Sequence, residues 1–239
     1  MTRTILVTGG GTGIGRAVAE RFAAGGADVV VTGRRPGPVT ETAEAIGGTA
    51  LAFDATDPAQ WEEALPRLPD RIDVLVNNAG GNTDFDSAEP ADLAGVAKAW
   101  QANLAANLLS AVLATTAVAD RLAAGGAVVQ LGSIAADNGA GSYGAAKAAL
   151  ASWNITLAGE LGPRDITCNV VSPGYVGDTE FFRGRLTDER RELLISRTAT
   201  GRPGTPEDVA GVVHYLASPD ARHVTGQVIN VNGGALPTR

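Results

Sequence analysis

The chain has 239 residues, of which 44% are hydrophobic, and a formal net charge of −7. This length suits one α/β domain, and the negative charge argues against a general affinity for nucleic acid or an anionic membrane. The single cysteine, Cys168, excludes an internal disulfide, and the two histidines, His214 and His223, stand too far apart to suggest a metal site. With no apolar run of membrane-spanning length and no signal-peptide pattern, we expect a cytoplasmic protein.

The N-terminal stretch combines a strand, a glycine turn and a helix. Residues 5–7 form an apolar run typical of a buried parallel strand, and five glycines follow within residues 8–15. Ile14, Val18 and Phe22 then recur with the spacing of one helix face. Glycines allow a close approach of the backbone to a ligand, and a helix N-terminus attracts phosphate. This stretch therefore predicts phosphate binding.

The glycine spacing is Thr-Gly-x-x-x-Gly-x-Gly, with Gly9, Gly13 and Gly15 in the fixed places. It departs from the commoner Gly-x-Gly-x-x-Gly, and a flexible surface turn is the alternative interpretation. The strand before it and the helix after it favour dinucleotide binding.

Strands and helices alternate along the rest of the chain. We expect further strands at residues 28–32, 49–53, 73–77, 127–131, 166–171 and 227–231, and helices at 40–46, 58–65, 92–124, 143–161 and 206–216, with an irregular, partly helical segment at 175–199. This order predicts one α/β domain over residues 1–239, a Rossmann-type doubly wound parallel sheet of about seven strands with helices on both faces.

Ligands of such sheets bind beyond the carboxyl ends of the strands, where glycine-rich and polar segments follow at residues 77–80, 132–134 and 172–174. Tyr143 and Lys147 lie one helical turn apart and share a helix face. Together with the glycine turn, these motifs resemble those of the single-domain short-chain dehydrogenases/reductases, in particular the 3-oxoacyl-acyl-carrier-protein reductase-like members. The resemblance extends to the final segment at residues 225–234.

The resemblance implies an oxidoreductase that interconverts a small-molecule ketone or aldehyde and an alcohol by hydride transfer with a nicotinamide dinucleotide. It also implies a homotetramer of two-fold symmetry, with a dimer as the second choice. Two alternatives are an NAD(H)-dependent sugar or polyol dehydrogenase and a cofactor-binding regulator without turnover.

The family's Tyr-x-x-x-Lys motif corresponds to Tyr143 and Lys147. A tyrosine pKa near 10 is too high for a good base, and we expect the nearby ammonium to lower it, so that Tyr143 acts as general acid or base. A surface pair is the alternative, but Lys147 is one of only two lysines beside seventeen arginines. Ser133 matches the family serine that binds the reacting carbonyl oxygen. Asn107 matches the asparagine of the proton relay, and Asn103 competes for that role.

The resemblance also assigns cofactor contacts. They are the glycine turn with its flanking residues (Gly9, Thr12, Gly13, Ile14, Gly15), the adenine-side residues (Asp54, Ala55, Asn78, Ala79, Gly80) and the nicotinamide-side residues (Pro173, Gly174, Val176, Thr179). Because Thr179 stands one place later than is common, Asp178 could fill its role. Nine residues separate Ser133 from Tyr143, about three fewer than usual, which shortens the wall of the substrate pocket.

The end of the second strand predicts the choice of dinucleotide. NAD-specific sheets place an acidic residue there for the ribose 2′-hydroxyl, whereas this chain has Gly33 followed by Arg34 and Arg35. A guanidinium suits phosphate oxygens, so we expect NADP(H) rather than NAD(H), with Arg34 as the main contact. Two solvated surface arginines are the alternative interpretation.

Overall fold

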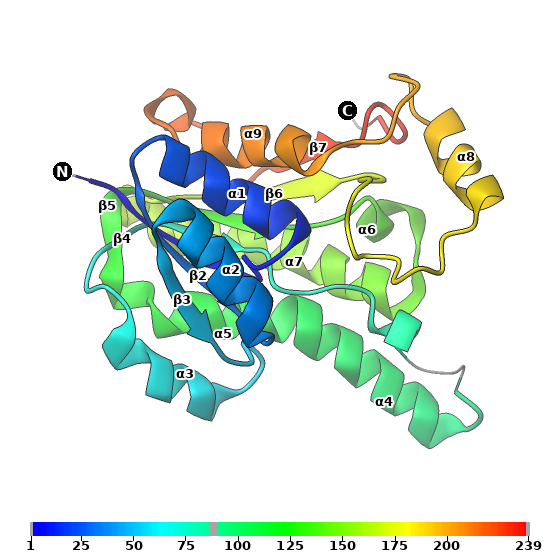
Figure 1. The fold of residues 1–239 in the computed structure, drawn as a ribbon, viewed down its shortest axis with the longest axis horizontal. Coiled ribbons are helices and arrows are strands. Elements are labelled where there is room, and N and C mark those ends of the chain that lie inside the picture. Colours follow the sequence, from blue (N-terminus) through cyan, green and yellow to red (C-terminus); the bar gives the residue numbers. More distant parts are fainter. Residues whose placement is uncertain (1, 87–89, 238–239) are drawn as a thin grey trace.

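A seven-stranded parallel sheet runs through the centre of the protein in the order β3-β2-β1-β4-β5-β6-β7 (Figure 1). The structure is a computed structural model that describes residues 2–86 and 90–237. Its strands are β1 (Thr4–Thr8), β2 (Asp28–Gly33), β3 (Thr49–Ala52), β4 (Ile72–Asn77), β5 (Leu122–Leu131), β6 (Thr167–Pro173) and β7 (Val228–Val231). The predicted fold, a Rossmann-type sheet with helices on both faces, is confirmed.

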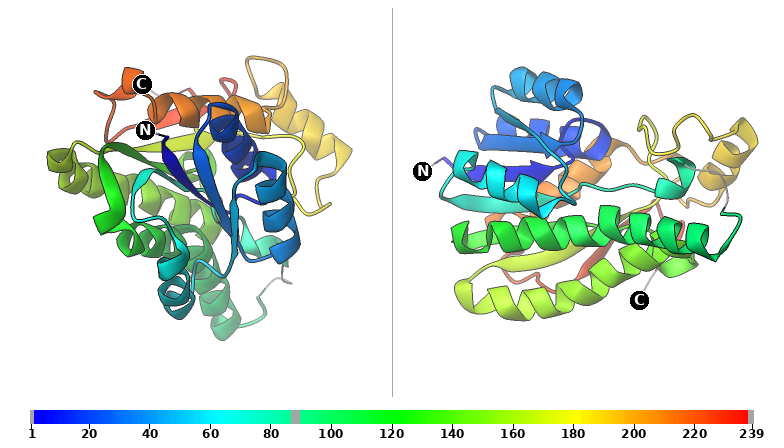
Figure 2. Two further views of the ribbon diagram at one scale, coloured as in Figure 1. Left: turned by 60° about the vertical axis from the view of Figure 1, so that its left-hand side comes forward. Right: turned by 90° about the horizontal axis from the view of Figure 1, so that it is seen from below.

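Helices cover both faces of this sheet (Figure 2). The α-helices are α1 (Gly13–Ala24), α2 (Pro36–Ile46), α3 (Pro58–Ala64), α4 (Leu93–Leu104), α5 (Ser110–Ala117), α6 (Ala135–Asn138), α7 (Gly141–Leu161), α8 (Asp188–Ser196) and α9 (Pro206–Leu216). Short 3-10 turns lie at η1 (Leu65–Arg67), η2 (Thr83–Asp86), η4 (Ala119–Arg121), η5 (Gly162–Arg164) and η6 (Pro219–Ala221), and η3 (Ala105–Leu109) is a π-helical turn.

Two apolar cores hold the layers together. The alternation of side chains along a strand sends Ile5 and Val7 of β1 to one core, with α1, α2 and α9, and Leu6 to the other, with α3, α5 and α7. All three residues are fully buried, as expected for a parallel sheet covered on both faces.

The prediction of one continuous helix over residues 92–124 is wrong. The π-helical turn η3 interrupts it after Leu104, α5 ends at Ala117, and β5 already begins at Leu122. The alanine-rich composition favours helix, but Leu122 pairs with Ile72 of β4. Gly125 has φ +78°, which a helix does not tolerate, and the strand register shifts before Val74.

The described residues include neither a membrane-spanning helix nor a metal-binding cluster. Residues 2–86 and 90–237 contain no helix long and apolar enough to span a bilayer. The same residues contain no group of three or more His, Cys, Asp or Glu side chains placed to hold a metal ion.

Candidate active site

The glycine turn follows β1 directly and leads into the N-terminus of α1. Gly9 and Gly13 have φ values of +66° and +52°, which L side chains rarely adopt. A Cβ atom on Gly15 would overlap the Gly9 carbonyl and the Asn78 side chain. Glycine is therefore required at these three positions for the chain to turn tightly and present backbone N–H groups at the helix end.

Asn78, predicted as a cofactor contact, holds the glycine turn. Its amide nitrogen donates hydrogen bonds to the carbonyls of Thr8 and Gly9, at 3.1 and 2.9 Å. In return, the Thr8 hydroxyl accepts from the backbone N–H groups of Asn78 and Ala79, both at 3.1 Å. The turns after β1 and β4 are thus tied together, so Asn78 positions the backbone that a phosphate would meet.

Tyr143, Lys147 and Ser133 meet beyond the carboxyl end of β5. Tyr143 and Lys147 belong to the first two turns of α7, and both are about 95% buried, with exposed fractions of 6% and 5%. The Lys147 ammonium lies 5.9 Å from the centre of the Tyr143 ring and donates a 2.7 Å hydrogen bond to the Leu131 carbonyl. The Ser133 side chain is hydrogen-bonded to Tyr143, and its oxygen also accepts from the Ala135 N–H at 3.1 Å.

The prediction that Lys147 lowers the pKa of Tyr143 is wrong. Burial raises the pKa of Tyr143 to about 12, although the hydrogen bond with Ser133 opposes the increase. Burial also lowers the pKa of Lys147, to about 8. Desolvation dominates because both groups lie in the interior. At neutral pH Tyr143 therefore carries its proton.

Both candidate asparagines are buried and bonded to the chain after β4. Asn107, in the π-helical turn, accepts from the Gly81 N–H at 2.9 Å and donates to the Gly81 carbonyl at 2.9 Å. Asn103 donates to the Asp84 carboxylate and the Ser142 hydroxyl, both at 2.8 Å. Asn103 thus reaches the residue before Tyr143, while Asn107 fixes the turn that follows Gly80. Local π-helix within an α-helix occurs frequently at functional sites.

Three other predicted cofactor contacts, Arg35, Asp54 and Ala55, follow the ends of β2 and β3. Arg35 forms an ion pair with Glu180 at 2.5 Å, across 145 residues of sequence. The Asp54 carboxylate accepts from the backbone N–H and hydroxyl of Thr56, at 2.9 and 2.8 Å, so it stabilises the turn after β3. The neighbouring Ala55 is buried, and its carbonyl accepts from the Trp61 indole.

A cluster of guanidinium groups forms where the segment after β6 meets the end of β2. Burial lowers the pKa of Arg183, and the positive charges of Arg34, Arg35 and Arg185 lower it further, so these four groups are electrostatic neighbours. Arg183 forms an ion pair with Asp86.

On the nicotinamide side, Thr179 and Asp178 point to different places. A Cβ atom on Gly13 would lie 3.5 Å from the Thr179 methyl group, so Thr179 packs beside the glycine turn. Asp178 is exposed, has φ +52°, and lines a surface cleft with Gly13, Arg16 and Glu20. Pro173 ends β6, and Val176 is buried and pairs with Gly204. Position therefore favours Thr179 over Asp178.

Aromatic rings cover the Tyr143 side of the site. The rings of Phe181 and Tyr143 lie 5.6 Å apart, and Phe181 also contacts Phe182 at 5.0 Å and Phe85 at 5.8 Å. Tyr175 contacts Phe182 at 5.9 Å. No local pattern in the sequence connects Phe85 or Tyr175 with the site.

Comparisons with known proteins agree with this arrangement. The profile of the family described as enoyl-(acyl carrier protein) reductase matches residues 9–235. An uncharacterized oxidoreductase of Methylorubrum extorquens is 38% identical, with 97% of each chain covered. The 3-oxoacyl-[acyl-carrier-protein] reductase of Escherichia coli is 35% identical, covering 96% of this chain and 95% of its own. The protein is a short-chain dehydrogenase/reductase.

Solved structures of other short-chain dehydrogenases/reductases have the same fold. One from Mycobacterium ulcerans superposes with a TM-score of 0.88 at 30% identity, covering 98% of this chain and 89% of its own. A Brucella melitensis structure described as a glucose/ribitol dehydrogenase gives a TM-score of 0.85 at 30% identity, covering 99% and 97%. The oxidoreductase family and its Rossmann-type architecture are thus established for this chain.

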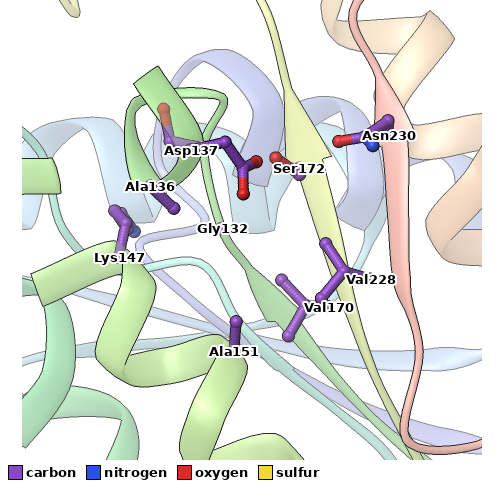
Figure 3. A pocket seen from close by; sticks show the side chains of 10 residues that line it. Gly132, Ala136, Asp137, Lys147, Ala151, Val170, Ser172, Val228 and Asn230 are labelled. Atoms are coloured by element: carbon purple, nitrogen blue, oxygen red, sulfur yellow. The ribbon is translucent and has the colours of Figure 1, made fainter. Parts of the chain in front are cut away.

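A cavity of about 240 Å³ lies next to the candidate catalytic residues (Figure 3). Ser133 and Lys147 line it, and the valines of β6 and β7 form its apolar side. Figure 3 shows the Asp137 carboxylate directed toward Ser172. Asp137 belongs to α6, which forms the short connection between Ser133 and Tyr143, so the shortened segment forms one wall of this cavity. The sequence predicted a shortened pocket wall in this segment but not the direction of Asp137.

Proposed function

We propose that the protein is an NADP(H)-dependent carbonyl reductase/alcohol dehydrogenase in which Tyr143 is the general acid. One observation carries the proposal. Tyr143 is buried, protonated at neutral pH and hydrogen-bonded to Ser133 at the carboxyl edge of the sheet. The phenol carries its proton at neutral pH, so Tyr143 can act as the general acid in carbonyl reduction.

The catalytic roles follow from the chemistry of these groups. The hydroxyls of Tyr143 and Ser133 would bind the carbonyl oxygen together, and Tyr143 would protonate that oxygen as negative charge develops on it. The Lys147 charge would stabilise the resulting phenolate. The reduced dinucleotide, when bound, supplies the hydride. Asn107 would act through the backbone, because its amide fixes the turn at Gly81.

The residues after β1, β4 and β6 fit a dinucleotide. Side chains at Gly9, Gly13 and Gly15 would fill or strain the turn at the N-terminus of α1, where phosphate binding is favourable. Asn78 maintains this turn, and Thr179 lies next to Gly13. The other predicted cofactor contacts lie at or after the carboxyl ends of β1, β2, β3, β4 and β6 and are proposed with them (Thr12, Ile14, Arg34, Arg35, Asp54, Ala55, Ala79, Gly80, Pro173, Gly174, Val176).

A charge count supports the preference for NADP(H). Of the four clustered arginines, Arg35 pairs with Glu180 and Arg183 with Asp86, which leaves two positive charges uncompensated among the described residues. A phosphate monoester carries about −1.5 to −2 charges at neutral pH. A 2′-phosphate would therefore balance the cluster, and Arg34 is the guanidinium that directly follows β2.

The names of the relatives are compatible with this reaction. The E. coli relative is a 3-oxoacyl-[acyl-carrier-protein] reductase, a name that describes the reduction of a ketone. The Brucella structure is described as a glucose/ribitol dehydrogenase, which keeps the polyol-oxidising alternative open. A regulator without turnover would not need Ser133, Tyr143 and Lys147 to converge.

The test compares kcat/KM for NADPH and NADH with a panel of ketones, and for NADP⁺ and NAD⁺ with polyols. We expect NADPH to be preferred in carbonyl reduction. Arg34→Ala should weaken NADPH by about ten- to a hundredfold, the size of a charge-assisted hydrogen bond, and leave NADH nearly unchanged. The exposed Arg67→Ala is the matched control. Equal kcat/KM for NADPH and NADH would contradict the preference, and no turnover with any substrate would contradict the activity.

We also propose a homotetramer. α4 projects from the body of the protein (Figure 1), and among its described side chains only Asn103 is buried. Leu93 and Trp100 of α4 have exposed fractions of 88% and 46%, and Ile155 of α7 has 68%. Exposed apolar residues gathered on neighbouring helices indicate a partner surface. A single domain and a cytoplasmic location stay predictions.

A further inference from the structure

Three of the five phenylalanines and two of the three tyrosines of the chain gather around the candidate active site. They come from η2 (Phe85), from the segment between β6 and α8 (Tyr175, Phe181, Phe182) and from α7 (Tyr143). Contact between η2 and the segment after β6 joins parts of the chain about a hundred residues apart. This concentration of aromatic side chains at the candidate active site suggests a role in substrate binding in addition to packing.

The rings meet edge to face. The planes of Phe85 and Phe181 are inclined by 89° and those of Phe181 and Phe182 by 87°. Such contacts are favourable because the positive ring edge meets the negative ring face. Phe85, Phe181 and Phe182 are only half-buried, so these rings retain accessible surface.

Phe181 is the link between this cluster and the reacting groups. Its ring is inclined by 55° to that of Tyr143, and its centre lies 5.6 Å away. A substrate oxygen held by the Tyr143 and Ser133 hydroxyls would place the group attached to its carbonyl carbon beside these rings. Two charged side chains of the same segment are paired, Glu180 with Arg35 and Arg183 with Asp86.

We infer that the preferred substrates are ketones or aldehydes whose carbonyl carries an aromatic ring, with that ring packed against Phe181 and Phe85. The inference rests on the proposed carbonyl reductase activity. A sugar or polyol would place hydroxyl groups against phenylalanine rings and lose their hydration. A saturated ring would be tolerated but would gain no edge-to-face contact.

The test uses two substrates that differ only in ring saturation, methyl phenyl ketone and methyl cyclohexyl ketone. Their intrinsic reactivities differ, so the informative quantity is the ratio of their kcat/KM values in each variant relative to the unmodified protein. Phe181→Leu keeps an apolar side chain and removes the ring. We expect the phenyl-to-cyclohexyl ratio to fall about two- to tenfold, the range that one aromatic pair contributes.

Phe85→Leu is the second variant and should lower the ratio in the same direction. Tyr215→Leu, an exposed aromatic on α9, is the matched control and should leave the ratio unchanged. Circular dichroism establishes that each variant folds. An unchanged ratio in both phenylalanine variants, with both ketones still reduced, would overturn the inference but not the proposed function. Absence of turnover with every carbonyl compound would instead overturn the proposed function and this inference with it.

Discussion

The Lys147 ammonium donates a 2.7 Å hydrogen bond to the Leu131 carbonyl, inside a site where burial lowers its pKa to about 8. This bond fixes the end of the charged side chain between α7 and the last residue of β5. It compensates only partly for the water that the ammonium loses on folding.

The low pKa of Lys147 predicts a stability that increases with pH. In the unfolded chain the ammonium has its ordinary pKa near 10.4, so between about pH 8 and pH 10 the unfolded state binds more protons than the native state. The native state therefore gains stability as the pH rises through this window. Compared with Lys147→Met, the unmodified protein should gain on the order of 1–2 kcal/mol in unfolding free energy between pH 7 and pH 9.5.

Urea denaturation at the two pH values measures this difference. Lys98→Met is the matched control, because Lys98 is the other lysine of the chain and is exposed. If the unmodified protein and Lys147→Met differ in unfolding free energy by the same amount at both pH values, that result would contradict the lowered pKa of Lys147.

Glu180 limits the affinity for the cofactor phosphate if Arg35 takes part in binding it. The Arg35–Glu180 ion pair is exposed, so its removal costs little stability. Glu180→Gln frees Arg35 and removes a negative charge, and the KM for NADPH should fall about two- to fivefold while that for NADH changes little. Asp165→Asn, which removes another exposed ion pair at the opposite end of the sheet, is the control. A higher KM for NADPH in Glu180→Gln would show that the carboxylate assists binding.

Gln130 is a buried amide in the middle of β5. Its exposed fraction is 0%, and within residues 2–86 and 90–237 neither polar atom of its side chain has a hydrogen-bond partner. Gln130→Met keeps the shape and removes the desolvated groups, so the free energy of unfolding should rise by about 1–3 kcal/mol. Gln101→Met, exposed on α4, should have almost no effect. A loss of stability in Gln130→Met would indicate that the amide is satisfied by an ordered water.

The exposed apolar residues of α4 and α7 predict assembly. α4 and α7 lie side by side (Figure 2, right), so Trp100 and Ile155 belong to neighbouring helices. Light scattering at micromolar concentration should give a tetramer for the unmodified protein, and Ile155→Glu should give smaller species because the charge would be buried in the interface. A monomeric unmodified protein would contradict the assembly.

The sequence predicted the fold well because buried parallel strands and glycine turns are local signals. Each of the seven strands was located, and α9 begins and ends at the predicted residues. The failure at residues 92–124 has a physical cause: alanine-rich sequence suits a helix, while pairing of Leu122 with Ile72 is a long-range contact. Likewise, α2 begins at Pro36, four residues before the predicted start, because proline is favoured at the first position of a helix.

The candidate site was predictable where a motif occupies consecutive positions. Tyr143 and Lys147 share a helix, so their proximity follows from spacing alone. The direction of the Tyr143 pKa was not predictable, because burial depends on Phe181 and other residues distant in sequence. The role of Asn78 in holding the glycine turn and the contact of Phe85 with Phe181 also depend on long-range packing.

The most direct test of the account is the rate of NADPH oxidation by Tyr143→Phe with a carbonyl substrate that the unmodified protein reduces. The substitution keeps the ring and removes the transferable proton, so the fold and NADPH binding should persist. A general acid typically contributes 10²–10⁴-fold, and we expect kcat to fall by at least about a hundredfold. A Tyr143→Phe protein that binds NADPH normally and keeps half of the activity would contradict the central claim that Tyr143 donates the proton.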